Sequence, residues 1–234
     1  MKYLDFLLDS INEFKVSFSQ ELLDGALKLY DYCESNSKFE YTHYYRKHII
    51  QHEFNRGGNF TDDIQEIVKE DILKPIDGIG YCESIKLEKI DAPRHEHQFQ
   101  YKKTSRLASV PAALPTTDEI YGSSCWHIDA GAPLNNMVML VYLNDVDEST
   151  GPFTIAYPTV LMEQGNDTAV TYRDTASIPS VSILGRAGTV VCFHSYLLHR
   201  GNVPIFGSRK AILISILPED PKYVLHLKEK KDII

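Results

Sequence analysis

Apolar residues in the first third of the chain recur at helical spacing in two segments. In residues 20–30 they return every three or four positions, and Ser19 stands directly before them as a favoured N-cap. Residues 62–73 repeat the pattern, with Thr61 as a cap and Pro75 as a stop. We therefore expect two amphipathic helices that pack on the outside of a sheet.

From Gly80 onward the pattern changes to short alternating or fully apolar runs, which are typical of strands. In residues 84–88, Ile85 and Leu87 lie on one face, whereas Lys86 and Glu88 lie on the other. Gly and Pro turns separate the runs, and many short strands with such turns favour a barrel or a double-sheet jelly roll. Strands are expected at residues 84–88, 98–102, 137–143, 153–157, 189–193 and 209–217.

The length of 234 residues fits a single domain that can bury a core. We expect residues 1–79 to form a mainly helical N-terminal part packed on the core, residues 80–218 to form the jelly-roll core, and residues 219–234 to form a charged tail. Loops carry specificity on a rigid scaffold, so residues 41–60 and 161–180 are candidates for a lid.

Composition and charge narrow the class of protein. The net charge of −8 argues against nucleic-acid binding, which requires a basic face. The four cysteines are scattered without a Cys-x-x-Cys pair, as expected of reduced thiols in a cytoplasmic protein. Asp5 and Asp9 interrupt the N-terminal apolar stretch, which therefore does not read as a signal peptide. The longest apolar run, residues 137–143, is far shorter than the ~20 residues that cross a bilayer, so no membrane association is expected.

Candidate metal chemistry lies between residues 126 and 209. His127 and Asp129 are two positions apart, so on a strand both side chains point to the same face and can share one ion. His199 follows about 70 residues later, after a Gly-bounded apolar strand. Two imidazoles and one carboxylate are the facial triad that holds Fe(II) and leaves coordination positions open.

Arg209 is placed on the last predicted strand, where it shares a face with Ala211, Leu213 and Ser215. Burying an arginine on an inward face is costly without an anionic partner. The distal carboxylate of a dicarboxylate, bound bidentately, would be such a partner.

Four segments resemble the Fe(II)/2-oxoglutarate-dependent dioxygenases, nearest their phytanoyl-CoA dioxygenase-like branch. They are Trp-His-x-Asp at 126–129, Leu-Asn-Asp-Val-Asp-Glu-Ser-Thr-Gly-Pro-Phe at 143–153, Gly-Thr-Val-Val-Cys-Phe-His through Leu-Leu-His-Arg-Gly at 188–201, and the trailing Arg209. The resemblance covers roughly residues 80–218 and implies a cupin-like double-stranded β-helix, a jelly roll with helices packed outside.

The resemblance also implies roles for individual residues. His127, Asp129 and His199 would be the iron ligands, and Arg209 would anchor the carboxylate of 2-oxoglutarate. The strand before the triad would supply a further co-substrate contact, Gln100 or Lys102.

The implied cofactors are Fe(II), 2-oxoglutarate as co-substrate and O₂. The implied reaction hydroxylates an unactivated C–H bond of a small molecule and releases succinate and CO₂. Related halogenases place a small residue at the carboxylate position, so Asp129 indicates oxygenation. Desaturation, ring formation and epimerisation remain open. The chain has Tyr157, Pro158 and Thr159 where the family continues into Pro-Gly-Ser-His, so the substrate cannot be inferred from the family.

The sequence also allows other metal ligands and other functions. His194 competes as the last ligand, but His199 is favoured because it precedes Arg209 by ten residues, a spacing that resembles the family's. His95 and His97 form a His-x-His pair that reads as an exposed loop, and Trp126 reads as core. Rival functions are a cupin-like metal-binding protein without oxygenase activity, such as an isomerase or sensor, and an inactive scaffold.

Overall fold

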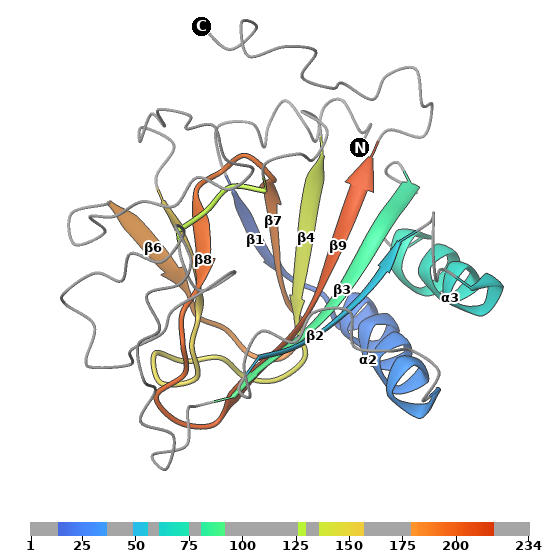
Figure 1. Ribbon diagram of the computed structural model, residues 1–234, viewed down its shortest axis with the longest axis horizontal. Helices are drawn as coiled ribbons and strands as arrows, with labels where there is room; N and C mark the ends of the chain where they lie inside the picture. Colours follow the sequence, from blue (N-terminus) through green and yellow to red (C-terminus); the bar gives the residue numbers. More distant parts are fainter. Residues whose placement is uncertain are drawn as a thin grey trace, which may run out of the picture.

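Two antiparallel sheets and a helical layer make up the described parts of the chain (Figure 1). The computed structural model describes residues 14–36, 49–55, 61–74, 81–91, 126–129, 136–156 and 179–217. The larger sheet has six strands in the order β1-β7-β4-β9-β3-β2, and the smaller sheet has three in the order β6-β5-β8. The larger sheet contains β1 (Lys15–Phe18), β2 (Ile49–Asn55), β3 (Tyr81–Asp91), β4 (Met137–Tyr142), β7 (Thr189–His194) and β9 (Ser208–Leu217). The smaller sheet contains β5 (Phe153–Ala156), β6 (Ser180–Ile183) and β8 (His199–Gly201).

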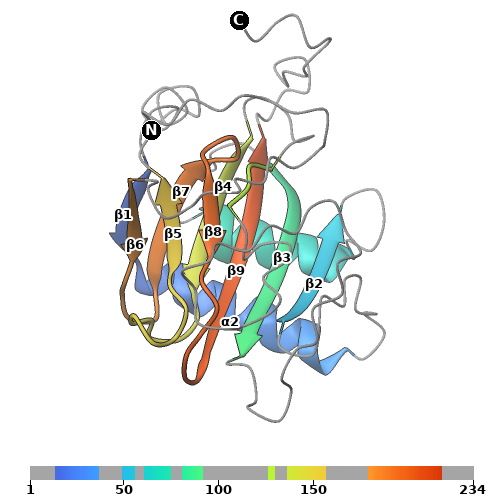
Figure 2. The same ribbon diagram turned by 60° about the vertical axis from the view of Figure 1, so that its left-hand side comes forward.

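Successive strands cross between the two sheets. The chain runs from β4 in the larger sheet through β5 and β6 in the smaller one, then through β7, β8 and β9 in the larger, smaller and larger sheets. An isolated bridge between His127 and His199 places residues 126–129 beside β8. This winding is that of a double-stranded β-helix, as predicted, and the two sheets face one another in Figures 1 and 2.

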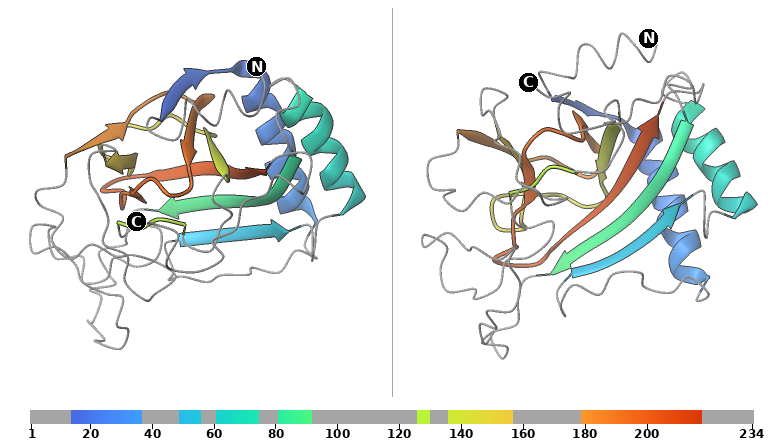
Figure 3. Two further views of the ribbon diagram at one scale, coloured as in Figure 1. Left: turned by 90° about the horizontal axis from the view of Figure 1, so that it is seen from above. Right: turned by 45° about the horizontal axis from the view of Figure 1, so that its top comes forward.

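The helices lie on the side of the larger sheet that is turned away from the smaller sheet (Figure 3). Helix α2 (Gln20–Ser35) begins as predicted, with the Ser19 hydroxyl accepting a 3.3 Å hydrogen bond from the Leu22 N–H. Helix α3 (Asp62–Ile67) is capped in the same way by Thr61 and continues as a π-helical segment, η1 (Val68–Leu73). None of the helices in the described ranges is long and apolar enough to cross a membrane.

The inner strands of the larger sheet are buried on both sides. Its outer face packs against the helices, and its inner face packs against the smaller sheet. Along β9, Ile212, Ile214 and Ile216 belong to the outer core, whereas Ala211 belongs to the inner one. Strand β4 alternates in the same way, which explains its unbroken run of apolar residues. Arg209 is two positions before Ala211, so it belongs to the inner face, as predicted.

The N-terminal part supplies edge strands as well as helices. Strands β1 and β2 form the two edges of the larger sheet, a role that the sequence patterns did not predict. The short strands β6 and β8 were not predicted either. The strand expected at 98–102, the pair His95 and His97, and most of both candidate lid segments lie outside the described residues. The division of the chain at residues 79 and 218 into a helical part, a jelly-roll core and a tail stays a prediction.

Candidate metal centre

Three ligating side chains meet at the junction of residues 126–129 with β8. The backbones of His127 and His199 exchange two hydrogen bonds, of 3.0 and 2.9 Å. The Asp129 N–H donates to the Ser195 carbonyl at 3.0 Å, which holds the segment against the end of β7. The Nε2 atoms of His127 and His199 each lie 3.9 Å from one oxygen of the Asp129 carboxylate. One ligand atom from each residue lies within 4.8 Å of the other two.

The surroundings of His199 keep its imidazole neutral and aim one nitrogen at the group. Its Nδ1 lies 2.8 Å from the Leu197 carbonyl, which can only accept, so Nδ1 carries the hydrogen and Nε2 keeps its lone pair. The pKa of His199 is lowered to about 4, mainly by burial and to a smaller extent by the nearby His127. A neutral imidazole held by a backbone carbonyl is the form that binds metal ions.

Aromatic side chains form an apolar wall behind His199. The rings of Phe153 and Phe193 lie 5.3 and 4.9 Å from its ring, and both phenylalanines are buried. Trp126 is buried as well, as its core assignment predicted, with the Arg200 guanidinium 4.7 Å from its ring centroid. His127 and Asp129 keep part of their surface exposed, whereas His199 does not.

This donor set fits a divalent iron ion. Two imidazole nitrogens and one carboxylate oxygen lie within 4.8 Å of one another, and this donor set would hold the ion and leave coordination positions open for other ligands. His194, the competing candidate, is not part of the group. Its Nδ1 accepts a 3.2 Å hydrogen bond from the Tyr196 N–H at the end of β7.

Arg209 is 1% exposed and its guanidinium is held by the protein itself. Its Nη2 donates to Glu88 Oε1 at 2.6 Å, and its Nη1 donates to the Gly151 carbonyl at 2.9 Å. The sequence argument that a buried arginine needs an anionic partner holds, but Glu88 on β3 already supplies one, so burial alone does not require a dicarboxylate. Among the described residues, Nε of Arg209 is buried without a hydrogen-bond partner.

Glu88 is the residue of this site that the sequence did not identify. The alternation of residues 84–88 placed it with Lys86 on the polar face of a strand, and that face proves to be the inner face of the larger sheet. Glu88 pairs across the ladder with Ala211 and is 3% exposed. Lys86 lies on the same face, and its charge also lowers the pKa of His199, although burial is the main cause. Glu88 could have been identified only from the pairing of β3 with β9, which the sequence patterns alone do not reveal.

Gly201 connects Arg209 to the three ligands. It follows His199 by two positions on β8, so both residues face the same way, about 7 Å apart along the strand. A Cβ atom on Gly201 would lie 2.3 Å from Arg209 Nη2, so the guanidinium rests against the backbone of β8. The arginine and the ligating histidine therefore line the same interior.

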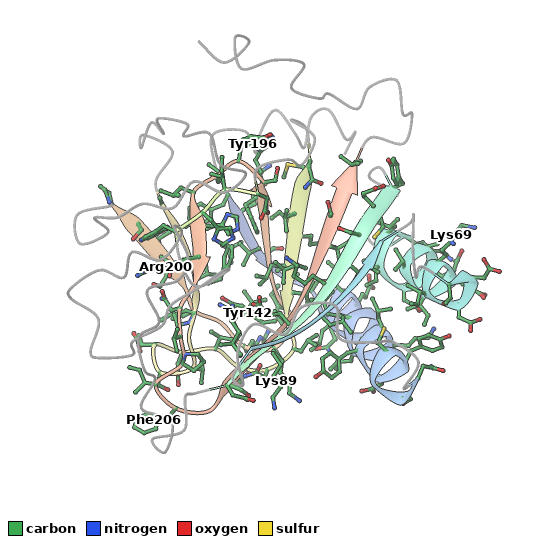
Figure 4. All side chains as sticks on the ribbon, in the orientation of Figure 1. Lys69, Lys89, Tyr142, Tyr196, Arg200 and Phe206 are labelled. Atoms are coloured by element: carbon green, nitrogen blue, oxygen red, sulfur yellow. The ribbon has the colours of Figure 1, made fainter. Side chains whose placement is uncertain are left out.

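Two other polar side chains of the inner face take structural roles. Tyr142 bridges the sheets, because its hydroxyl donates to the Ile183 carbonyl at 2.9 Å and accepts from the Phe153 N–H at 3.0 Å (Figure 4). Ser215 donates to the Asn136 side chain. Gln100 and Lys102 lie outside the described residues.

No family model matches the sequence, and no curated protein matches it. Solved structures do match the fold. The non-haem α-ketoglutarate-dependent carbocyclase SnoK from nogalamycin biosynthesis superposes with a TM-score of 0.59 at 14% identity, over 92% of this chain and 83% of that one. The epimerase SnoN from the same biosynthesis gives 0.58 at 14% identity over the same shares. EctD from S. alaskensis, with 2-oxoglutarate and 5-hydroxyectoine, gives 0.52 at 13% identity, over 92% and 75%. The chain shares the jelly roll of these iron- and 2-oxoglutarate-dependent enzymes, and the phytanoyl-CoA dioxygenase-like branch stays a prediction.

Proposed function

We propose that the protein is a non-haem Fe(II)- and 2-oxoglutarate-dependent oxygenase that hydroxylates a small molecule. The observation that carries the proposal is the convergence of His127, Asp129 and His199 inside a jelly roll whose inner face also presents Arg209. The structural neighbours support it, because those described with a bound metal or co-substrate contain iron or 2-oxoglutarate.

Each residue has a distinct part in this function. Nε2 of His127, Nε2 of His199 and the Asp129 carboxylate would hold the iron, and Arg209 would hold the distal carboxylate of 2-oxoglutarate. When bound, iron and 2-oxoglutarate supply the oxidising chemistry that consumes O₂ and releases succinate and CO₂. The Leu197 carbonyl orients the His199 ring for this purpose. Phe153 packs against the His199 ring and keeps water from that side of the ring.

Hydroxylation is the proposed outcome among several that share the same cofactors. The neighbours include a carbocyclase, an epimerase and a protein with 5-hydroxyectoine in its structure, so the fold accommodates more than one reaction. The carboxylate of Asp129 fills the position that a halide would need. A polar small molecule is the proposed substrate, and the cytoplasmic location and the lack of nucleic-acid or membrane partners stay predictions.

The alternative is a cupin-like metal-binding protein without oxygenase activity, such as an isomerase or sensor. One observation favours it: the Glu88 carboxylate satisfies Arg209 from within, so the buried arginine does not by itself require a co-substrate. The two functions differ in whether 2-oxoglutarate is consumed.

Succinate formation tests the proposal. Purified protein with Fe(II), 2-oxoglutarate and O₂ is expected to release succinate slowly without a primary substrate, and His199→Ala should abolish this release. His194→Gln serves as the matched control, because it changes a buried histidine outside the ligand group and should retain the turnover. Metal binding without any succinate in folded wild-type protein would favour the alternative.

A further inference from the structure

The ion pair between Arg209 and Glu88 lies on the inner face of the larger sheet. Both side chains are almost fully buried, at 1% and 3% side-chain exposure. In the register of β3 with β9, Glu88 is opposite Ala211 and Arg209 is opposite Ile90, so the pair runs diagonally across one face. The interaction therefore occupies the same interior as the three metal ligands.

The guanidinium of Arg209 is only partly used by the protein. One bond from Nη2 reaches Glu88 and one from Nη1 reaches Gly151, while Nε is buried without a partner in the described part of the chain. A guanidinium has more N–H groups than these bonds employ, and they point along several edges of one plane. The Nε edge is therefore a donor position for a further carboxylate.

A second carboxylate on Arg209 would meet the charge of Glu88. Two like charges that share one buried cation repel each other, and burial leaves little water to screen them. Glu88 must therefore weaken the binding of any anion at Arg209, even though it holds the guanidinium in place when no anion is bound. Lys86, two positions before Glu88 on the same face, adds a positive charge that partly offsets this repulsion.

We propose that Glu88 is an internal competitor for the anion site of Arg209 and so sets the affinity of the protein for its carboxylate co-substrate. The co-substrate carboxylate takes the Nε edge, and Arg209 then lies between it and Glu88. This inference rests on the proposed function and adds a specificity-determining residue to it.

The first test is Glu88→Gln, which removes the charge but keeps an amide oxygen that can accept from Nη2. In anaerobic calorimetric titrations of the metal-loaded protein, the dissociation constant of 2-oxoglutarate should fall by about a hundredfold. This size follows from two unit charges ~6 Å apart at an effective dielectric constant of ~20. Glu83→Gln, a charge change at a partly exposed position on the same strand, should leave the constant unchanged.

Pyruvate provides a matched control ligand. It has the same 2-oxo acid group as 2-oxoglutarate but lacks the distal carboxylate, so its affinity should not change in Glu88→Gln. A folded Glu88→Gln protein that binds 2-oxoglutarate no more tightly than wild type overturns the inference and leaves the proposed function standing. If neither protein binds 2-oxoglutarate while both bind metal, the proposed function fails as well.

An independent measurement on the unmodified chain covers the case in which Glu88→Gln does not fold. The ¹⁵Nε–H signal of Arg209, assigned by its loss in Arg209→Lys, should shift when 2-oxoglutarate is added to Zn(II)-loaded wild-type protein. Binding of 2-oxoglutarate without any movement of that signal would overturn the use of the Nε edge.

Discussion

A methyl group added at Gly201 should displace the guanidinium of Arg209, the proposed anion site, without touching a candidate metal ligand. In Gly201→Ala, the new Cβ would lie 2.3 Å from Arg209 Nη2 and 3.0 Å from Nη1, well inside ordinary contact. The guanidinium has to move by about 1 Å or more to restore contact at 3.4 Å or beyond. Such a movement lengthens or breaks the 2.6 Å bond to Glu88, which lies in a buried environment.

The expected cost combines two effects. A weakened buried hydrogen bond between charged groups costs about 1.5–3 kcal/mol, and overpacking costs about 1–3 kcal/mol. These overlap because one displacement causes both, so we expect the free energy of unfolding to fall by about 3 kcal/mol. Urea unfolding followed by circular dichroism measures this change, and calorimetry on the folded protein should show weakened binding of 2-oxoglutarate.

Gly207→Ala separates this effect from a general cost of replacing glycine. Gly207 has a φ of 67°, where a side chain is strained, but a Cβ there would meet only Thr150 at 3.7 Å. It should lose about 1–2 kcal/mol of stability and bind 2-oxoglutarate like wild type. A Gly201→Ala protein as stable as wild type, with unchanged co-substrate affinity, would show that the close approach of Arg209 to Gly201 matters neither for stability nor for binding.

Three further predictions concern stability. Tyr142→Phe should lower the free energy of unfolding by about 1–3 kcal/mol in urea, because it leaves the buried Phe153 N–H and Ile183 carbonyl without their bonds; an unchanged midpoint would show that this bridge contributes nothing. Ser19→Ala should cost about 1 kcal/mol in the same assay through loss of the cap on α2, and a neutral result would contradict the capping role. Because the pKa of His199 is lowered to about 4, the unfolded chain takes up its proton first, so metal-free protein should lose up to about 3 kcal/mol as the pH falls from about 6.5 to about 4. The free energy of unfolding of His199→Gln should depend less on pH across that range. An equal pH dependence in the variant would show that other groups cause the loss.

The helices and long strands were predictable because their burial is decided locally. Ser19 and Thr61 precede periodic apolar runs, and the run after Asn136 is apolar throughout because both faces of the larger sheet are covered. Strand β8 has only three residues and is held by pairing with β5 and with His127, partners that are distant in the sequence. A segment of that length carries no periodicity of its own.

The grouping of His127, Asp129 and His199 was predictable from residue type and spacing, whereas the partner of Arg209 was not. His127 and Asp129 carry a two-residue signature, and His199 lies at a marked turn before Arg209. Glu88 belongs to a strand whose alternation is typical of a half-exposed sheet. Its polar side chains turn inward because β3 pairs with β9, a long-range contact across 121 residues. The charge balance of the site depends on that contact.

Anaerobic titration with Fe(II) and 2-oxoglutarate shows whether the protein binds both cofactors of the proposed oxygenase. We expect a weak visible metal-to-ligand charge-transfer band in wild-type protein, its loss in His199→Ala, its weakening in Arg209→Ala, and its retention in His194→Gln. Folded, iron-loaded wild-type protein that shows no such band at saturating 2-oxoglutarate would contradict the oxygenase function and leave a metal-binding jelly roll.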